Sequence, residues 1–349
     1  MPQLDLVAPD VLRRQQELRN EFLTASPFRH VVIDPFFDAG FADRLEQAFP
    51  AFDEQLATNE DGYAGGKCVH EDVASLGGPF QTLDRLVECH GFRNLISTIT
   101  DIPNLIYDPA YYGGGTHDNR HGQDLDPHVD FNFHPFSGQH RRLNLIVFLN
   151  RDWEESWGGC LELHQDPRTE DGYRDARKVV PAFNRCVIFE TTESSWHGFK
   201  AIDLPEGRRD LSRRSFALYY YTEDRPAAET GKPHSTIYVD RPLPDSIRPG
   251  KTLRESDIQL LKMLMSRRDH HLQRLYGYLA DAEHRLREIR RGRPPTEIPN
   301  TDDPELLRDC LYDLDSEVAR LRQRLDEIEQ SNSWRLTAPL RKLRRLFRS

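Results

Sequence analysis

The chain has 349 residues, of which 37% are hydrophobic and 30% charged, which suits one sizeable domain with an accessory region, or two domains. The formal net charge of −10 argues against broad nucleic-acid binding, because an acidic surface repels the phosphate backbone. The five cysteines form no CxxC pair, which argues against a disulfide framework or a zinc ribbon.

No stretch of the sequence looks like a membrane span or an export signal. There is no run of 18 apolar residues, and the segment that follows Met1 lacks the apolar region of a signal peptide. Together with the odd number of cysteines, this predicts a protein of the reducing cytoplasm.

The first hundred residues alternate between helical and strand patterns. A polar helix is expected over 9–25, and a short strand with β-branched residues over 27–34. The segment 41–49 places apolar residues four apart, which predicts one buried helix face, and 81–98 reads as a second amphipathic helix.

Short strand patterns separated by Gly, Pro, Asn and Asp follow between 105 and 222. They are expected at 143–149, 159–164, 178–180, 185–190 and 215–222. Regular short strands with turn signals predict a sandwich or barrel, here a jelly roll of the double-stranded β-helix type with flanking N-terminal helices. We assign residues 1–245 to this mainly β domain.

The C-terminal region follows a heptad pattern. Apolar residues alternate by three and four in 251–292 and again in 305–349, with a proline-rich linker or turn at 292–304. We therefore expect two coiled-coil helices after the β domain. They could form a homo-oligomer or an intramolecular hairpin.

Three His-x-Asp triplets begin at His70, His128 and His164. Side chains two apart on a strand point to the same face, so such a pair can reach one metal ion. The flanking sequence favours His128 and Asp130, which can lie on a strand at a barrel mouth. His70 and His164 are interpreted as solvated loop histidines.

A third metal ligand and a basic residue should follow on later strands. His197 and the pair Arg213 and Arg214 supply them in this order. Two histidines and one carboxylate on one octahedral face are typical of non-haem iron(II) oxygenases. A buried arginine is suited to the distal carboxylate of a dicarboxylic cosubstrate, because its planar fork binds both oxygens.

The order of motifs resembles the prolyl-4-hydroxylase-like family, which includes the hypoxia-sensing prolyl hydroxylases. After His128-x-Asp130 come RRLNLIVFLNRDW at 141–153, WGGCLEL at 157–163, then His197 and Arg213-x-Ser215. The resemblance covers about 27–222. Three glycines at 113–115 ahead of the triplet make it closer to bacterial members.

This resemblance implies that His128, Asp130 and His197 bind Fe(II) and form the catalytic centre. It also implies that Arg213 grips the C5 carboxylate of 2-oxoglutarate, with Ser215 assisting from the same strand face. Arg214 is the competitor. Strand alternation favours Arg213, because Arg213 shares a small, polar face with Ser215 and leaves Phe216 to pack outward.

The sequence departs from the family pattern at two places. The segment between His197 and Arg213 carries an insertion around 204–209, and Phe148 stands where relatives often have a cosubstrate-binding tyrosine. Cosubstrate contacts are then redistributed. Asn144 and Tyr112 are candidates, although each is equally well explained as an ordinary strand or loop residue.

The chemistry implied by the resemblance is decarboxylation of 2-oxoglutarate to succinate, coupled to hydroxylation by O2, with ascorbate as a further candidate cofactor. Halogenation is disfavoured, because related iron halogenases leave the carboxylate position open for halide and this chain has Asp130. A scaffold that kept the fold but lost turnover is an alternative of another class.

The end of the chain suggests a location and a substrate. Residues 331–341, SNSWRLTAPLR, resemble a short tail on bacterial glycosyltransferases of surface-polysaccharide synthesis. Its mixture of apolar and basic residues could bind the inner face of the membrane or contact a glycosyltransferase. A frayed basic helix end explains it equally well. If the resemblance to the glycosyltransferase tail holds, the substrate is a glycan component. A protein substrate, as for a peptidyl-prolyl hydroxylase, is the runner-up.

Overall fold

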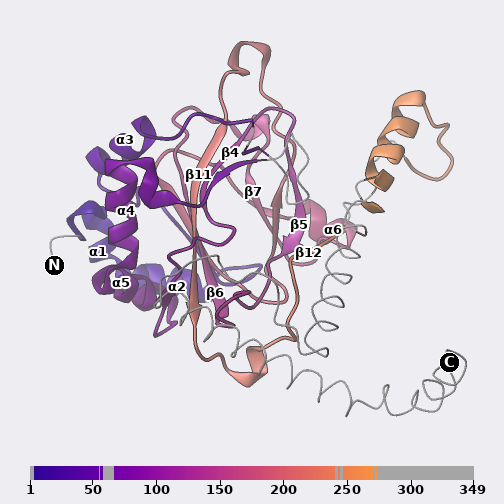
Figure 1. Ribbon diagram of the computed structural model, residues 1–349. Helices are drawn as coiled ribbons and strands as arrows, with labels where there is room; N and C mark the ends of the chain where they lie inside the picture. The colour runs from indigo at the N-terminus through magenta and orange to yellow at the C-terminus, as the bar shows by residue number, and fades with distance from the viewer. Residues whose placement is uncertain are drawn as a thin grey trace, which may run out of the picture. The chain divides into compact units, whose positions relative to one another are not determined.

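The computed structural model describes residues 4–54, 56–57, 67–239, 243, 247–266, 268–269 and 272 (Figure 1). The chain divides into two units, 1–134 with 139–275, and 135–138 with 276–349, and the fold and site described here belong to the first. Residues 255–266 of the expected first coiled-coil helix are helical, whereas most of 251–292 and all of 305–349 lie outside the described residues. Among the described helices, none is long and apolar enough to cross a membrane.

Five helices precede the main run of strands: α1 Pro9–Arg13, α2 Gln15–Thr24, α3 Ala39–Gln47, α4 Gly78–Glu88 and α5 His90–Thr100. Asp38 caps α3 by accepting hydrogen bonds from the backbone N–H groups of Gly40 and Phe41. The helix expected over 81–98 is instead two helices. Cys89 has extended backbone angles there, and its Sγ accepts a hydrogen bond from the N–H of Phe92, so that α5 starts anew.

The strands form two antiparallel sheets. The larger has the order β1-β9-β6-β11-β4-β2, with β3 also pairing with β11, and the smaller has the order β12-β5-β10-β7-β8. The strands of the larger sheet are β1 His30–Ile33, β2 Cys68–His70, β3 Ile106–Tyr107, β4 Gly115–Asn119, β6 His140–Phe148, β9 Arg185–Glu190 and β11 Arg213–Thr222. Those of the smaller are β5 Leu125–Val129, β7 Leu161–His164, β8 Arg177–Val179, β10 Trp196–Phe199 and β12 Ile237–Tyr238, and a short helix α6, Glu170–Arg174, joins β7 to β8. This β-rich core has the expected jelly-roll fold.

The two faces of the larger sheet have different partners. Phe216 and Leu218 on β11 join the main hydrophobic core with residues of the N-terminal helices, and the hydroxyl of Tyr220 donates to the carbonyl of Val87 on α4. On the opposite face, Phe148 packs with Leu163 of the smaller sheet. The alternation expected for β11 is therefore present, and the face that carries Arg213 points between the two sheets.

Gly158, just before β7, occupies a backbone conformation that only glycine adopts easily. Its φ is +71°, and a Cβ atom would lie 2.0 Å from the carbonyl oxygen of Ala201. We expect Gly158→Ala to lower the free energy of unfolding by about 1–3 kcal/mol or more, because it adds a clash to a strained φ. Gly207→Ala is the matched control, because its Cβ would meet open space. Equal denaturation midpoints for the two variants would contradict this expectation.

Candidate metal centre

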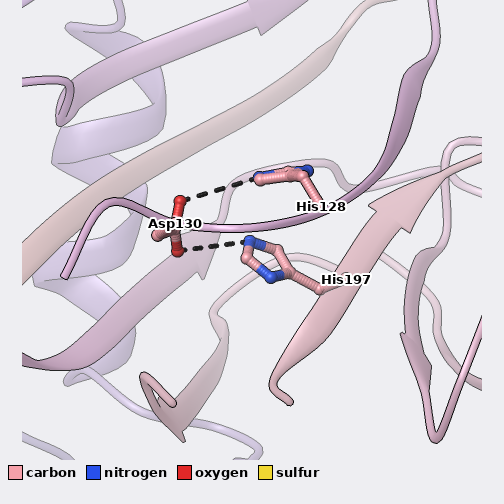
Figure 2. A group of neighbouring side chains, drawn as sticks. All are labelled: His128, Asp130 and His197. Atoms are coloured by element: carbon pink, nitrogen blue, oxygen red, sulfur yellow. Dashed lines mark ion pairs between the residues drawn. The ribbon is translucent and has the colours of Figure 1, made fainter. Parts of the chain in front are cut away.

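Two neighbouring strands of the smaller sheet bring the predicted ligands together. β5 and β10 pair so that His128 and His197 lie opposite each other, and Asp130 follows the end of β5. The Nε2 atoms of His128 and His197 each lie 3.6 Å from a carboxylate oxygen of Asp130 (Figure 2). All three side chains are buried, and within the described residues they are the one group of His, Cys, Asp and Glu side chains that could hold a metal ion.

Backbone carbonyl groups orient the two imidazole rings. The Nδ1 atom of His128 lies 2.9 Å from the carbonyl oxygen of Asp126, and that of His197 lies 2.9 Å from the carbonyl oxygen of Ser195. A proton on Nδ1 that is donated to these carbonyls leaves the lone pair of Nε2 directed at the shared centre. Burial, with a contribution from nearby His128, lowers the pKa of His197 to about 3, so that this ring is neutral and able to bind a cation.

Asp130 is held by a pair of side chains from β6. Its Oδ2 accepts a hydrogen bond of 2.8 Å from the Nδ2 of Asn144 and lies 3.1 Å from the Nη2 of Arg141. Arg141 is fully buried and also donates from Nε and Nη2 to the Oδ1 of Asn144, at 3.1 and 2.8 Å. Burial alone would raise the pKa of Asp130, but nearby Arg141 and His197 outweigh it and hold this pKa well below its usual range. The carboxylate is therefore ionised and fixed in orientation.

Sequence reasoning missed Arg141 and gave Asn144 another role. Three residues apart on a regular strand, these side chains would point to opposite faces. The pairing of β6 with β11 shifts register, however, so that Tyr221 lies opposite Arg141 and Tyr219 opposite Asn144. This irregularity turns Arg141 to the same face as Asn144. In the structure the Asn144 amide donates a hydrogen bond to Asp130. The sequence alone does not reveal this contact, because it depends on the irregular pairing of β6 with β11.

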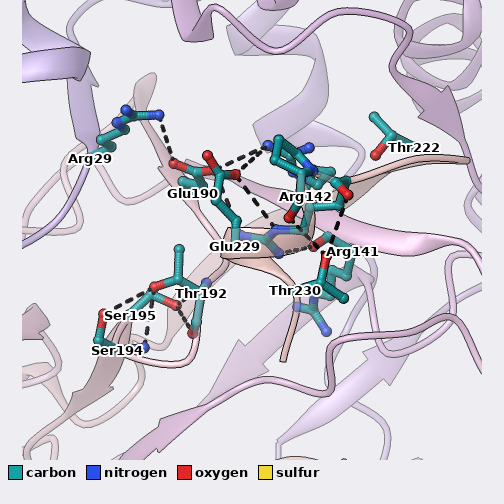
Figure 3. Close-up of polar contacts among 12 residues, drawn as sticks. Arg29, Arg141, Arg142, Glu190, Thr192, Ser194, Ser195, Thr222, Glu229 and Thr230 are labelled. Atoms are coloured by element: carbon teal, nitrogen blue, oxygen red, sulfur yellow. Dashed lines mark hydrogen bonds and ion pairs between the residues drawn. The ribbon is translucent and has the colours of Figure 1, made fainter. Parts of the chain in front are cut away.

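Removing the Arg141 side-chain charge should weaken metal binding. We expect Arg141→Met to lower Fe(II) affinity by about 10- to 100-fold, the usual loss when an outer partner of a metal ligand is removed. Arg142→Met is the matched control. Arg142 is also buried, but its partners are Glu190 at 3.2 Å and Glu229 at 3.5 Å, in a separate ion network that also includes Arg29 (Figure 3).

Anaerobic titration with Fe(II) measures the affinity, and denaturant unfolding separates it from stability. Both arginine variants should lose stability, since each removes a buried cation that pairs with a buried carboxylate, Asp130 or Glu190. Only Arg141→Met should lose affinity for the metal. Equal affinity in both variants would mean that Arg141 does not position Asp130.

Arg213 lies at the start of β11 and is buried between the sheets. Its Nε donates to the carbonyl of Gly159 at 2.6 Å, and its guanidinium carbon lies 4.9 Å from the ring centre of Phe148 and 4.4 Å from that of Phe199. Burial lowers the pKa of Arg213 to about 10, still well above neutral pH. Among the described residues no carboxylate forms an ion pair with Arg213. The buried guanidinium can therefore bind a carboxylate group of a ligand.

The other predicted cosubstrate residues differ in position. Arg214 points to the opposite face, where its Nε donates to the Ser212 hydroxyl at 3.3 Å, and its side chain is 36% exposed. Ser215 is buried on the Arg213 side of the strand. Tyr112 is 39% exposed and packs its ring edge against Phe131, the residue after Asp130.

The two other His-x-Asp histidines are not the solvated loop residues that the sequence suggested. His164 is fully buried at the end of β7 and stacks on Tyr173 with ring centres 5.5 Å apart. His70 lies half-buried at the end of β2, with its Nε2 3.7 Å from the Sγ of Cys68. His164 is buried because β7 lies between β10 and β8 in the smaller sheet, whereas β2 is the edge strand of the larger sheet and leaves His70 half-buried. Neither belongs to the metal-binding group.

Comparison with known families supports this geometry. Residues 114–224, which include the three candidate ligands and Arg213, match the family model described as the 2OG-Fe(II) oxygenase superfamily. This match identifies a 2OG-Fe(II) oxygenase domain within residues 114–224. Over an alignment of 111 residues, the chain is 25% identical to prolyl 3-hydroxylase OGFOD1 of Mus musculus, which covers 29% of this chain and 20% of the mouse protein. The match thus spans about a fifth of that relative.

The chain is also similar to several solved structures. A Trichoplax adhaerens prolyl hydroxylase, solved with a hypoxia inducible factor peptide, is 17% identical, with a TM-score of 0.42 over 63% of this chain and 96% of its own. HygX of Streptomyces hygroscopicus, solved with nickel and 2-oxoglutarate, is 13% identical, with a TM-score of 0.41 over 66% and 96%. A Pseudomonas putida prolyl-4-hydroxylase is 11% identical, with a TM-score of 0.37 over 61% and 94%.

Proposed function

We propose that this chain is an Fe(II)- and 2-oxoglutarate-dependent dioxygenase that hydroxylates its substrate. His128, Asp130 and His197 would hold the iron, and Arg213 would bind the distal carboxylate of 2-oxoglutarate. The observation that carries this proposal is the buried His-Asp-His group, together with a buried arginine that has no carboxylate partner among the described residues, inside a segment that matches the oxygenase family.

The residues of the site have separate tasks in this reaction. The Nε2 atoms of the two histidines and Asp130 suit an open ferrous site, because three ligands leave positions for cosubstrate and O2. Iron, when bound there, couples the oxidative decarboxylation of 2-oxoglutarate to hydroxylation of the substrate. Phe148 and Phe199 exclude water from the Arg213 guanidinium, which strengthens its attraction for a carboxylate.

For the substrate, we propose a glycan component of surface-polysaccharide synthesis. The support is the tail sequence 331–341, which lies outside the described residues. In this proposal the enzyme acts in the cytoplasm, and the tail contacts the inner face of the membrane or a glycosyltransferase. The coiled-coil segments would assemble a homo-oligomer. A protein substrate is the second candidate, favoured by the similarity to the mouse prolyl 3-hydroxylase.

The test is succinate formation from 2-oxoglutarate with Fe(II) and ascorbate present, measured with glycan and peptide substrates in turn. We expect turnover to require iron and to rise with one substrate class. Hydroxylated glycan identified by mass spectrometry would support the first substrate, and hydroxylated peptide the second. Iron-independent succinate formation, or none with any substrate while iron and 2-oxoglutarate bind, would favour the non-catalytic scaffold instead.

A further inference from the structure

The larger sheet places three side chains in one row across its inner face. Ser215 on the central strand β11 pairs with His117 on β4 at one side and with Phe148 on β6 at the other. Directly paired residues of antiparallel strands point to the same face. Arg213 lies two residues before Ser215 and shares this face. His117 and Phe148 therefore flank Ser215 on the side where Arg213 is buried (β4, β11 and β6 in Figure 1).

These two flanking side chains differ in what they can offer a ligand. Phe148 is fully buried and has no atom that forms hydrogen bonds, and its ring packs beneath the Arg213 guanidinium. His117 has a ring nitrogen, Nε2, that is buried and has no hydrogen-bond partner among the described residues. A buried nitrogen without a partner is costly, so a hydrogen-bonding ligand at this place would stabilise it.

The surroundings of His117 indicate the charge of that partner. Burial holds the pKa of His117 well below its ordinary value, and the positive charges of Lys67 and Arg213 lower it further, which together outweigh the backbone groups of Gly113 and Gly114 that raise it. The ring is therefore neutral, and it lies in a region where the nearby charges that affect it are positive. Such a region favours an anion, and a neutral imidazole can donate an N–H from Nε2 to it.

We propose that His117 is a further cosubstrate-binding residue, whose Nε2–H donates a hydrogen bond to the carboxylate that Arg213 binds. This proposal rests on the proposed function, since it assumes that 2-oxoglutarate occupies the Arg213 pocket. Arg213, Ser215 and His117 together present a cation, a hydroxyl and a ring N–H to one carboxylate. Phe148 contributes only apolar packing to the same pocket.

Three substitutions test this assignment in the Fe(II)-loaded protein by anaerobic titration with 2-oxoglutarate. His117→Leu should weaken binding by roughly 10-fold, the loss expected for one hydrogen bond to a charged group. His117→Gln keeps an N–H donor at this position and should weaken binding less. His70→Leu is the matched control. His70 pairs with Thr116 on the neighbouring strand, and this pair faces away from the pocket.

A rescue experiment separates this role from general packing. In the His117→Leu background, Phe148→Tyr should restore most of the affinity for 2-oxoglutarate. The tyrosine hydroxyl would supply a hydrogen-bond donor from the side of Ser215 opposite to His117. In steady-state assays the KM for 2-oxoglutarate should rise in His117→Leu with little change in kcat, and fall again in the double variant. A structural role alone would not be reversed by a substitution on another strand.

The outcomes distinguish this proposal from the function on which it rests. Unchanged affinity in His117→Leu, with affinity lost in Arg213→Ala, would overturn only the assignment of His117. Unchanged affinity in both would overturn the proposed cosubstrate site itself. If His117→Leu does not fold, then His117→Phe decides, because it keeps an aromatic ring without a hydrogen-bond donor and should weaken binding. Unchanged or tighter binding in that variant would count against the proposal.

Discussion

Replacing His128 or His197 with alanine should leave a folded protein that no longer retains Fe(II). Two remaining ligands cannot hold an open ferrous site, so the loss of affinity should exceed the roughly 10- to 100-fold that removal of an outer partner costs. Iron content per chain after anaerobic loading and desalting is the measurement. His70→Ala, which changes a His-x-Asp histidine outside the metal-binding group, is the matched control.

Asp130→Ala should also lose the metal, but it removes the partner of Arg141 as well. An unpaired buried arginine costs about 3–5 kcal/mol, so this variant should unfold at a lower denaturant concentration than the two histidine variants. The double variant Asp130→Ala with Arg141→Met should recover stability without recovering iron. Iron content near one per chain in all three single variants would show that the metal centre lies elsewhere.

Arg213→Ala should weaken 2-oxoglutarate binding by about 1.5–3 kcal/mol, because a charge-assisted hydrogen bond in a buried site is lost. Iron binding should be unchanged, since in the described part of the chain Arg213 forms no hydrogen bond or ion pair with the three ligands and donates instead to the carbonyl of Gly159. Arg213→Lys keeps the charge without the planar fork and should have an intermediate effect. Titration of the Fe(II)-loaded protein gives the affinity.

Arg214→Ala is the control from the same strand. Arg214 faces the other side of the sheet, with its Nε 3.9 Å from the Oδ2 of Asp118, and its side chain is 36% exposed. We therefore expect little change in cosubstrate affinity. A larger loss in Arg214→Ala than in Arg213→Ala would mean that the anion binds on the helix-covered face of the sheet.

The local sequence determined much of this architecture. Period-two apolar patterns predict strands because side chains alternate along extended backbone, and β6, β7, β8, β9 and β11 lie close to the ranges expected for them. The same alternation predicts that His128 and Asp130 share a face, and that Arg213 and Arg214 do not. Strand positions and the face to which a side chain points depend on residues a few positions away in the sequence. A short segment of the chain is therefore enough to predict them.

Other features depend on which strands become neighbours, and this only the tertiary structure decided. The irregular pairing of β6 with β11 turns Arg141 toward Asp130 and directs the Asn144 amide to the same carboxylate. The position of β4 beside β11 brings His117, nearly a hundred residues earlier in the sequence, into one row with Ser215. The burial of His164 likewise follows from the packing around β7. Local periodicity carries no information on strand order or on a one-residue shift in register. The His128, Asp130 and His197 group could therefore be predicted from a motif, whereas the side chains that contact Asp130 and those that lie in one row with Ser215 could not.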